Sequence, residues 1–282
     1  MVATFNERLA ASAARAGSWL CVGLDPDPAQ FPDGLGPEDT LEFCLAIVEA
    51  TQHVAAAVKP NAAFFEALGR DGAGVLADLV ESLPPGLPVI YDAKRGDIGN
   101  TAQKYAEAAF DELGADAITV APYMGRDSVE PFARYEDKGV FVLARTSNST
   151  ARDFQDLPIV PMGASILPSL SMGASALYHH VAKAAMGWNK DFGNIGLVAG
   201  ATYPRELKEL RGICGPGVPL LIPGVGAQGA DAKSTLKAGA DAKGQFALVN
   251  VGRAILQAGK GQDWQEKAKA AAEAFANDLK AR

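Results

Sequence analysis

Four charged residues follow an apolar run in one short stretch, "PVIYDAKRGDIGNT" (88–101). They are Asp92, Lys94, Arg95 and Asp97. Asp92 and Lys94 are two positions apart, so in an extended strand their side chains point to the same face. Buried charges are tolerated when they are paired, so alternating carboxylates and ammonium groups are an allowed way to concentrate charge. The stretch therefore predicts a charged site at the end of a buried strand.

Lys59 ends a second apolar run, "AAAVKPN" (55–61), and we expect it to converge on Asp92 and Lys94. A lysine can stabilise negative charge that develops on carbon and then protonate that carbon, while a fixed carboxylate beside it repels a substrate carboxylate. This pattern indicates a decarboxylation. Arg95 alternates with Lys94 and should point away from it, which favours an outward ion pair.

A candidate phosphate site comes late in the chain, in "IPGVGAQG" (222–229) and "VNVGRAI" (249–255), where Arg253 adds a bidentate cation. The glycines of the first segment also spell GxGxxG, the dinucleotide fingerprint. That fingerprint belongs early in a chain, with an acidic residue about twenty positions later, and neither condition is met. A plain glycine turn without a ligand is the remaining alternative.

Short apolar runs alternate with amphipathic helical patterns along the whole chain, which indicates a parallel sheet with helical crossovers. Eight such units predict an α/β fold, a closed (β/α)8 TIM barrel, and a doubly wound open sheet is the alternative. In a barrel, active sites lie at the carboxyl ends of the strands, where Asp25, Lys59 and Asp92 are found. The predicted strands are 19–25, 55–61, 88–94, 116–123, 139–147, 194–202, 219–226 and 246–255.

No linker or charge block divides the sequence, so we expect one domain over residues 1–282, with a leading helix at 4–16 that ends before Gly17. The longest irregular region, 147–175, follows the fifth predicted strand. A segment of this length in a compact domain is often a lid or a binding loop.

Composition excludes several classes of protein. The net charge of −7 argues against a nucleic-acid partner, and no apolar run reaches the length of a membrane span. Cys21, Cys44 and Cys214 have no metal or disulfide spacing, and we expect them to be reduced core residues of a cytoplasmic protein. His53, His179 and His180 lack a third ligand at suitable spacing, so no metal and no cofactor is expected.

The segment from Asp92 to Thr101, DAKRGDIGNT, resembles the D-x-K-x-x-D-I-x-x-T signature of the orotidine 5'-phosphate decarboxylase family. The resemblance covers nearly the whole chain and is strongest to the longer bacterial branch. It includes "GLDPD", "VKPNAAFFEALG", "APYMGRDSVEPF", "RTSN", "PGVGAQG" and "VGRAI".

This resemblance implies a homodimeric carboxy-lyase that needs no cofactor and converts orotidine 5'-phosphate to uridine 5'-phosphate (UMP) and CO2, the last step of pyrimidine biosynthesis. Lys94 corresponds to the proton donor to C6 of the pyrimidine, and Lys59 and Asp92 correspond to its partners in the charged array. The resemblance further implies that a second subunit contributes Asp97, a catalytic carboxylate, together with Ile98 and Thr101.

The same resemblance implies the substrate contacts. Asp25 would bind ribose hydroxyls, Ser147 the pyrimidine, Gln228 both phosphate and base, and Gly252 with Arg253 the phosphate, while Pro223 would line the pocket. Two departures bear on these loops: "SNST" (147–150) replaces the expected Asn-Pro-Gly after the serine, and Ala230 replaces a glycine.

Three other functions are alternatives. Magnesium-dependent sugar-phosphate decarboxylases or aldolases of the same superfamily share D-x-K-x-x-D, but they carry an acidic residue where this chain has Lys59, a cation that would repel a metal. A Schiff-base aldolase would need a neutral Lys94, which flanking carboxylates disfavour. A non-catalytic nucleotide-binding barrel would have no need to keep the clustered charges.

Overall fold

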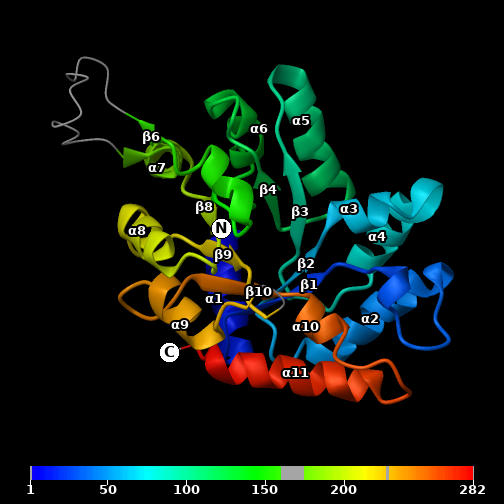
Figure 1. Ribbon diagram of the computed structural model, residues 1–282. Coiled ribbons are helices and arrows are strands. Elements are labelled where there is room, and N and C mark those ends of the chain that lie inside the picture. Colours follow the sequence, from blue (N-terminus) through cyan, green and yellow to red (C-terminus); the bar gives the residue numbers. More distant parts are fainter. Residues whose placement is uncertain (1, 160–174, 227–228, 282) are drawn as a thin grey trace.

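Eight parallel strands curve into a barrel in the computed structural model, which describes residues 2–159, 175–226 and 229–281 (Figure 1). The strand order is β2-β1-β10-β9-β8-β5-β4-β3, and parallel bridges from Val58 to Val89 and from Asn61 to Asp92 join its two ends. This closure confirms the predicted TIM barrel over the open sheet. The strands are β1 (Leu20–Leu24), β2 (Ala57–Pro60), β3 (Ile90–Arg95), β4 (Ala117–Val120), β5 (Gly139–Arg145), β8 (Ile195–Ala199), β9 (Leu220–Pro223) and β10 (Ala247–Val251).

Every predicted apolar run overlaps one of these strands, although the ends differ. The clearest difference lies in 246–255, where β10 stops at Val251 and a short helix, α10 (Arg253–Leu256), begins. Gly252 causes the break because its backbone (φ −111°, ψ −88°) leaves the extended conformation. Arg253 is therefore a helical residue that follows a strand.

The leading helix is α1 (Phe5–Ala16), as predicted. Thr4 is its N-cap and forms a capping box with Glu7, and Gly17 ends the helix with a left-handed backbone (φ 64°). The other helices are α2 (Thr40–Thr51), α3 (Ala62–Glu66), α4 (Gly72–Glu81), α5 (Gly99–Glu107), α6 (Glu130–Ala133), α7 (Leu177–Phe192), α8 (Pro204–Cys214), α9 (Ala232–Gly239) and α11 (Trp264–Asp278). No described helix is long and apolar enough to cross a membrane.

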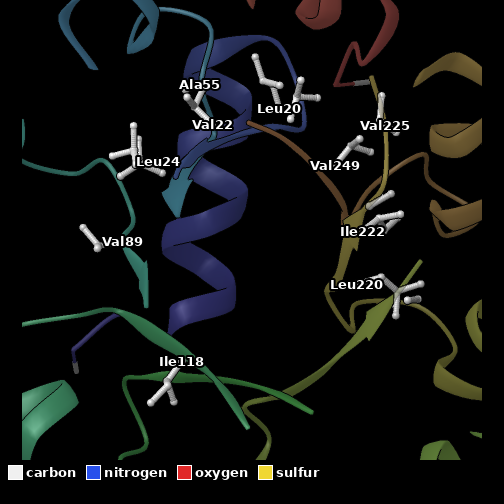
Figure 2. Close-up of a cluster of buried hydrophobic side chains, with 14 of the residues drawn as sticks. Leu20, Val22, Leu24, Ala55, Val89, Ile118, Leu220, Ile222, Val225 and Val249 are labelled. Carbon is white, nitrogen blue, oxygen red and sulfur yellow. The ribbon is translucent and has the colours of Figure 1, made fainter. Parts of the chain in front are cut away.

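Both faces of the strands are buried, which explains their continuous apolar sequences. In β1, Leu20, Val22 and Leu24 belong to the larger cluster between the strands and the surrounding helices, part of which Figure 2 shows. Cys21 points the other way, into a second cluster inside the barrel that also contains Phe5 of α1. The leading helix thus contributes to the barrel interior, which leaves the opposite end for a site.

The irregular region 147–175 contains some regular structure. A 3-10 helix, η6 (Ser149–Asp153), is followed by β6 (Pro158–Ile159), which pairs antiparallel with β7 (Ser175–Ala176). Residues 160–174 lie outside the described residues, so the prediction of a lid stays a prediction.

Two of the cysteines match the prediction of core thiols. Cys21 and Cys44 are buried and free, and burial raises the pKa of each to about 12, so neither forms a thiolate at neutral pH. Cys214 differs, because it is only partly buried where α8 ends.

Candidate active site

Asp92 lies between two lysines at the carboxyl end of the strands. Its Oδ2 is 2.6 Å from Lys59 Nζ and its Oδ1 is 2.7 Å from Lys94 Nζ. Thr119 of β4 donates its hydroxyl to the same Oδ1 at 2.9 Å. The Lys59 side chain is only 4% exposed and that of Asp92 11%, whereas that of Lys94 is 50% exposed. The predicted convergence of the three charges is confirmed, and Lys94 is the member that a ligand can reach.

The backbone around Lys94 departs from a regular strand. Lys94 has a left-handed conformation (φ 48°), and the pairing of β3 with β4 shifts register between Tyr91 and Arg95. A non-glycine residue in this region costs roughly 1–3 kcal/mol and is often found at functional sites. The Lys94 N–H donates to Thr119 Oγ1 at 2.9 Å, so the same threonine holds both the lysine backbone and the Asp92 carboxylate.

Charge pairing outweighs burial in this array. Burial acts to raise the pKa of Asp92, but the adjacent charges of Lys59 and Lys94 and their hydrogen bonds hold it well below its usual range. Burial likewise acts to lower the pKa of Lys59, and the charges of Asp92 and Asp25 reverse this and raise it. At neutral pH Asp92 is therefore a carboxylate and Lys59 an ammonium ion, in spite of their burial.

A cavity of about 430 Å³ opens above the array. Its lining includes residues from all eight barrel strands or from the loops after them, as expected for the catalytic end of a barrel. Five of the predicted substrate-binding residues line it together with Lys59, Asp92 and Lys94: Asp25, Ser147, Pro223, Gly252 and Arg253.

Other predicted site residues are not part of this cavity wall. Asp97, Ile98 and Thr101 are absent from the described residues that line it, and Asp97 accepts a hydrogen bond from the Ile98 N–H at 2.8 Å. Gln228 lies outside the described residues. Arg95 points outward as predicted: its Nη2 is 2.9 Å from Glu66 Oε1, and its guanidinium lies over the Tyr105 ring.

Several polar cavity residues were missed from the sequence, among them Asn61, Thr119 and Asn250. Asn250 is a polar residue inside the apolar run of β10, a signal that was available. Its Oδ1 and that of Asp25 are buried and lack a hydrogen-bond partner among the described residues. A Cβ on Gly23 would lie 3.1 Å from Asn250 Oδ1, so this glycine makes room for the amide. Buried acceptors without partners indicate a ligand or water that supplies donors.

The described residues contain no group of three or more His, Cys, Asp or Glu side chains arranged to hold a metal ion. The histidines instead bond to single partners, His53 to Glu273, His179 to Glu209 and His180 to Ser175.

The family model for the orotidine 5'-phosphate decarboxylase / HUMPS family matches residues 18–271, which include the charged array and the strands that line the cavity. The chain belongs to this family. The family that the resemblance predicted is thereby confirmed.

Named relatives agree with this membership. Two curated proteins called orotidine 5'-phosphate decarboxylase, from Azoarcus sp. (strain BH72) and Dechloromonas aromatica (strain RCB), are 48% and 47% identical to this chain. The matches cover 95% and 94%, respectively, of this chain and of the relative. Among solved structures, Leishmania donovani OMP decarboxylase is 39% identical with a TM-score of 0.79, over 97% of this chain and 99% of that one. Leishmania donovani UMP synthase is 42% identical with a TM-score of 0.82, over 97% of this chain and 56% of that one.

Proposed function

We propose that this chain is the carboxy-lyase that converts orotidine 5'-phosphate to UMP and CO2 without a cofactor, the last step of pyrimidine biosynthesis. The observation that carries the proposal is the ionised Asp92 held between Lys59 and Lys94 at the floor of the cavity. The curated relatives bear the same activity in their names. Lys59 stands where a magnesium-dependent relative would need an acidic ligand, so the array disfavours that alternative.

In the proposed reaction the substrate carboxylate lies next to Asp92, and their repulsion is relieved when CO2 leaves. The electron pair of the broken C–C bond stays on C6 of the pyrimidine, where the Lys94 ammonium stabilises it and then delivers a proton. The Lys59 side chain is only 4% exposed and its Nζ lies 2.6 Å from Asp92, so its main role is to keep Asp92 charged. These interactions strengthen in the transition state, which is the requirement for catalysis.

Binding at the other end of the substrate supports this step. Arg253 and Gly252, with Gln228, would hold the phosphate, and the unpartnered Oδ1 of Asp25 would accept from ribose hydroxyls. Ser147 and Pro223 would contact the pyrimidine. Energy from these remote contacts can be expressed at the reacting carbon rather than as tight ground-state binding.

The experiment that tests the function is the loss of orotidine 5'-phosphate absorbance on mixing with purified protein in EDTA. We expect decay that is independent of metal. Decay that appears only after magnesium is added would favour the sugar-phosphate relatives, and UMP binding without any decay would favour a nucleotide-binding barrel.

Arg253→Ala should act mainly on affinity. Loss of a charged hydrogen bond to phosphate costs about 1.5–3 kcal/mol, so we expect KM for orotidine 5'-phosphate to rise by roughly ten- to hundredfold. Steady-state kinetics and UMP titration measure this effect. A variant with normal affinity and no turnover would contradict the assignment to phosphate.

The proposal includes a homodimer in which Asp97, Ile98 and Thr101 reach the partner's cavity. Exposed apolar side chains near this segment support it: Ile98, Tyr105, Tyr123 and Met124 are between 38% and 94% exposed. Such a patch is typical of an interaction surface. Within each subunit, residues 1–282 would form one domain, since β1 near one end of the chain pairs with β10 near the other. We propose that the protein acts in the cytoplasm.

Mixing two inactive variants tests the shared site. If Asp97→Asn and Lys94→Ala each remove activity, an equal mixture that exchanges subunits places one intact site in each heterodimer. About a quarter of the wild-type activity should then return, because half of the dimers are mixed and each has one intact site of two. Exchange that is verified by mass spectrometry and restores nothing would show that Asp97 does not act across the interface.

A further inference from the structure

The cavity wall after β5 is held in place by the side chains of Arg145, the last residue of β5, and of residues in two other segments. Three polar groups of the Thr146–Ser147 backbone each have a side-chain partner. The Thr146 N–H donates to Gln155 Oε1 at 2.8 Å, the Thr146 carbonyl accepts from Arg145 Nη1 at 2.7 Å, and the Ser147 carbonyl accepts from Thr202 Oγ1 at 2.8 Å. Side-chain bonds that satisfy a loop backbone in this way fix its position relative to the barrel.

Arg145 is the centre of this arrangement. Its side chain is 1% exposed, and its Nε and Nη2 donate to the two carboxylate oxygens of Asp156 at 2.8 and 3.0 Å. Its guanidinium carbon lies 3.9 Å from the centroid of the Tyr203 ring. A bidentate salt bridge combined with stacking on an aromatic ring fixes both the plane and the rotation of a guanidinium group. A lysine ammonium group cannot form either interaction in this geometry.

The partners of Arg145 tie the wall to the stem of the irregular region. Asp156 and Gln155 lie between η6 and β6, and the Gln155 carbonyl accepts from the Tyr178 N–H at 2.9 Å in α7. On the barrel side, a Cβ on Gly200 would lie 2.7 Å from the Ser147 backbone, so the segment after β8 lies against the same residue. Ser147 is therefore enclosed on two sides, while it remains part of the cavity lining.

We propose that Arg145 is a positioning residue for base recognition, because it fixes the Thr146–Ser147 backbone and so holds Ser147 at the cavity wall. Arg145 is not among the described residues that line the cavity, so it acts through its neighbours rather than on the substrate. This inference rests on the proposed function, in which Ser147 contacts the pyrimidine and Arg253 contacts the phosphate.

The test compares UMP with ribose 5-phosphate, which lacks the base, by calorimetric titration of Arg145→Lys. We expect the Kd for UMP to rise by roughly tenfold, which corresponds to about 1.4 kcal/mol, and the Kd for ribose 5-phosphate to change by less than about twofold. A purely structural role would lower the folded fraction without changing the ratio of the two dissociation constants. Arg205→Lys is the matched control, because Arg205 is 82% exposed and pairs with Glu209 at the surface.

Thr202→Val keeps the test decisive if Arg145→Lys does not fold. This nearly isosteric change removes only the bond to the Ser147 carbonyl, and we expect the same selective loss of UMP affinity at a smaller size. Equal weakening of both ligands, or unchanged UMP affinity in both folded variants, would overturn the inference. Failure of the proposed function is a separate result, since it would appear as wild-type protein that neither decarboxylates orotidine 5'-phosphate nor binds UMP.

Discussion

Lys94→Ala is expected to lower kcat for orotidine 5'-phosphate by roughly a hundredfold to ten-thousandfold, which is the range that a positioned general acid contributes. The affinity for UMP should stay within several fold of the wild-type value, because the phosphate contacts at Arg253 lie elsewhere in the cavity. The Lys94 side chain is 50% exposed, whereas that of Lys59 is 4% exposed, so Lys94 is the better placed lysine to deliver a proton.

Rapid kinetics and UMP titration on the same preparation separate the two effects. Lys104→Ala is the matched control, since the Lys104 side chain is 76% exposed and pairs with Glu107 on α5. Equal losses of turnover and of UMP affinity would show that Lys94 binds ligand rather than protonating it.

Asp92→Asn is expected to remove activity and also to destabilise the fold by about 3–5 kcal/mol, the usual cost of leaving one member of a buried ion pair unpaired. Lys59 would then carry a buried charge without its nearest counter-ion. Urea unfolding at neutral pH measures the loss. A variant as stable as the wild type would mean that Lys59 is neutral in the folded protein, contrary to the raised pKa described above.

The stability difference between wild type and Asp92→Asn should depend on pH. The pKa of Asp92 is lower in the folded protein than in the unfolded chain, so its contribution is complete above the unfolded pKa of about 3.9 and is lost as pH falls through the folded pKa. The pKa of Lys59 is raised, so its contribution is complete below about 10.4 and is lost as pH rises through the folded value. The difference should therefore be widest near neutral pH and narrow in acid, and unfolding curves between about pH 7 and pH 3 would show it.

The sequence predicted the barrel well because parallel strands that are covered on both faces must be continuously apolar. It also predicted the charged array, since Lys59, Asp92 and Lys94 each end such a run. The alternation of side chains along a strand could not show how Lys94 reaches Asp92. The Lys94 backbone is left-handed, and its N–H donates a hydrogen bond to Thr119 of the next strand. A contact between strands of this kind leaves no local pattern.

The substrate end of the cavity was harder to predict. Asn250 is a polar residue in an apolar run, but its position in the cavity depends on Gly23 across the sheet, which is visible only once β1 and β10 are paired. Arg145, the last residue of β5, was not singled out from the sequence. Its burial depends on Asp156 and Tyr203, and the position of these partners relative to Arg145 is set by tertiary packing.

The pairing of β1 with β10 has a consequence for how the protein acquires activity. Asp25 and Arg253 follow β1 and β10, which are neighbours in the barrel but lie far apart in the sequence. Contacts between residues so far apart in sequence form more slowly than local contacts, because a long loop must close before the two strands can pair. The nucleotide cavity, which is lined by both Asp25 and Arg253, is therefore complete only once β10 has paired with β1 and closed the barrel.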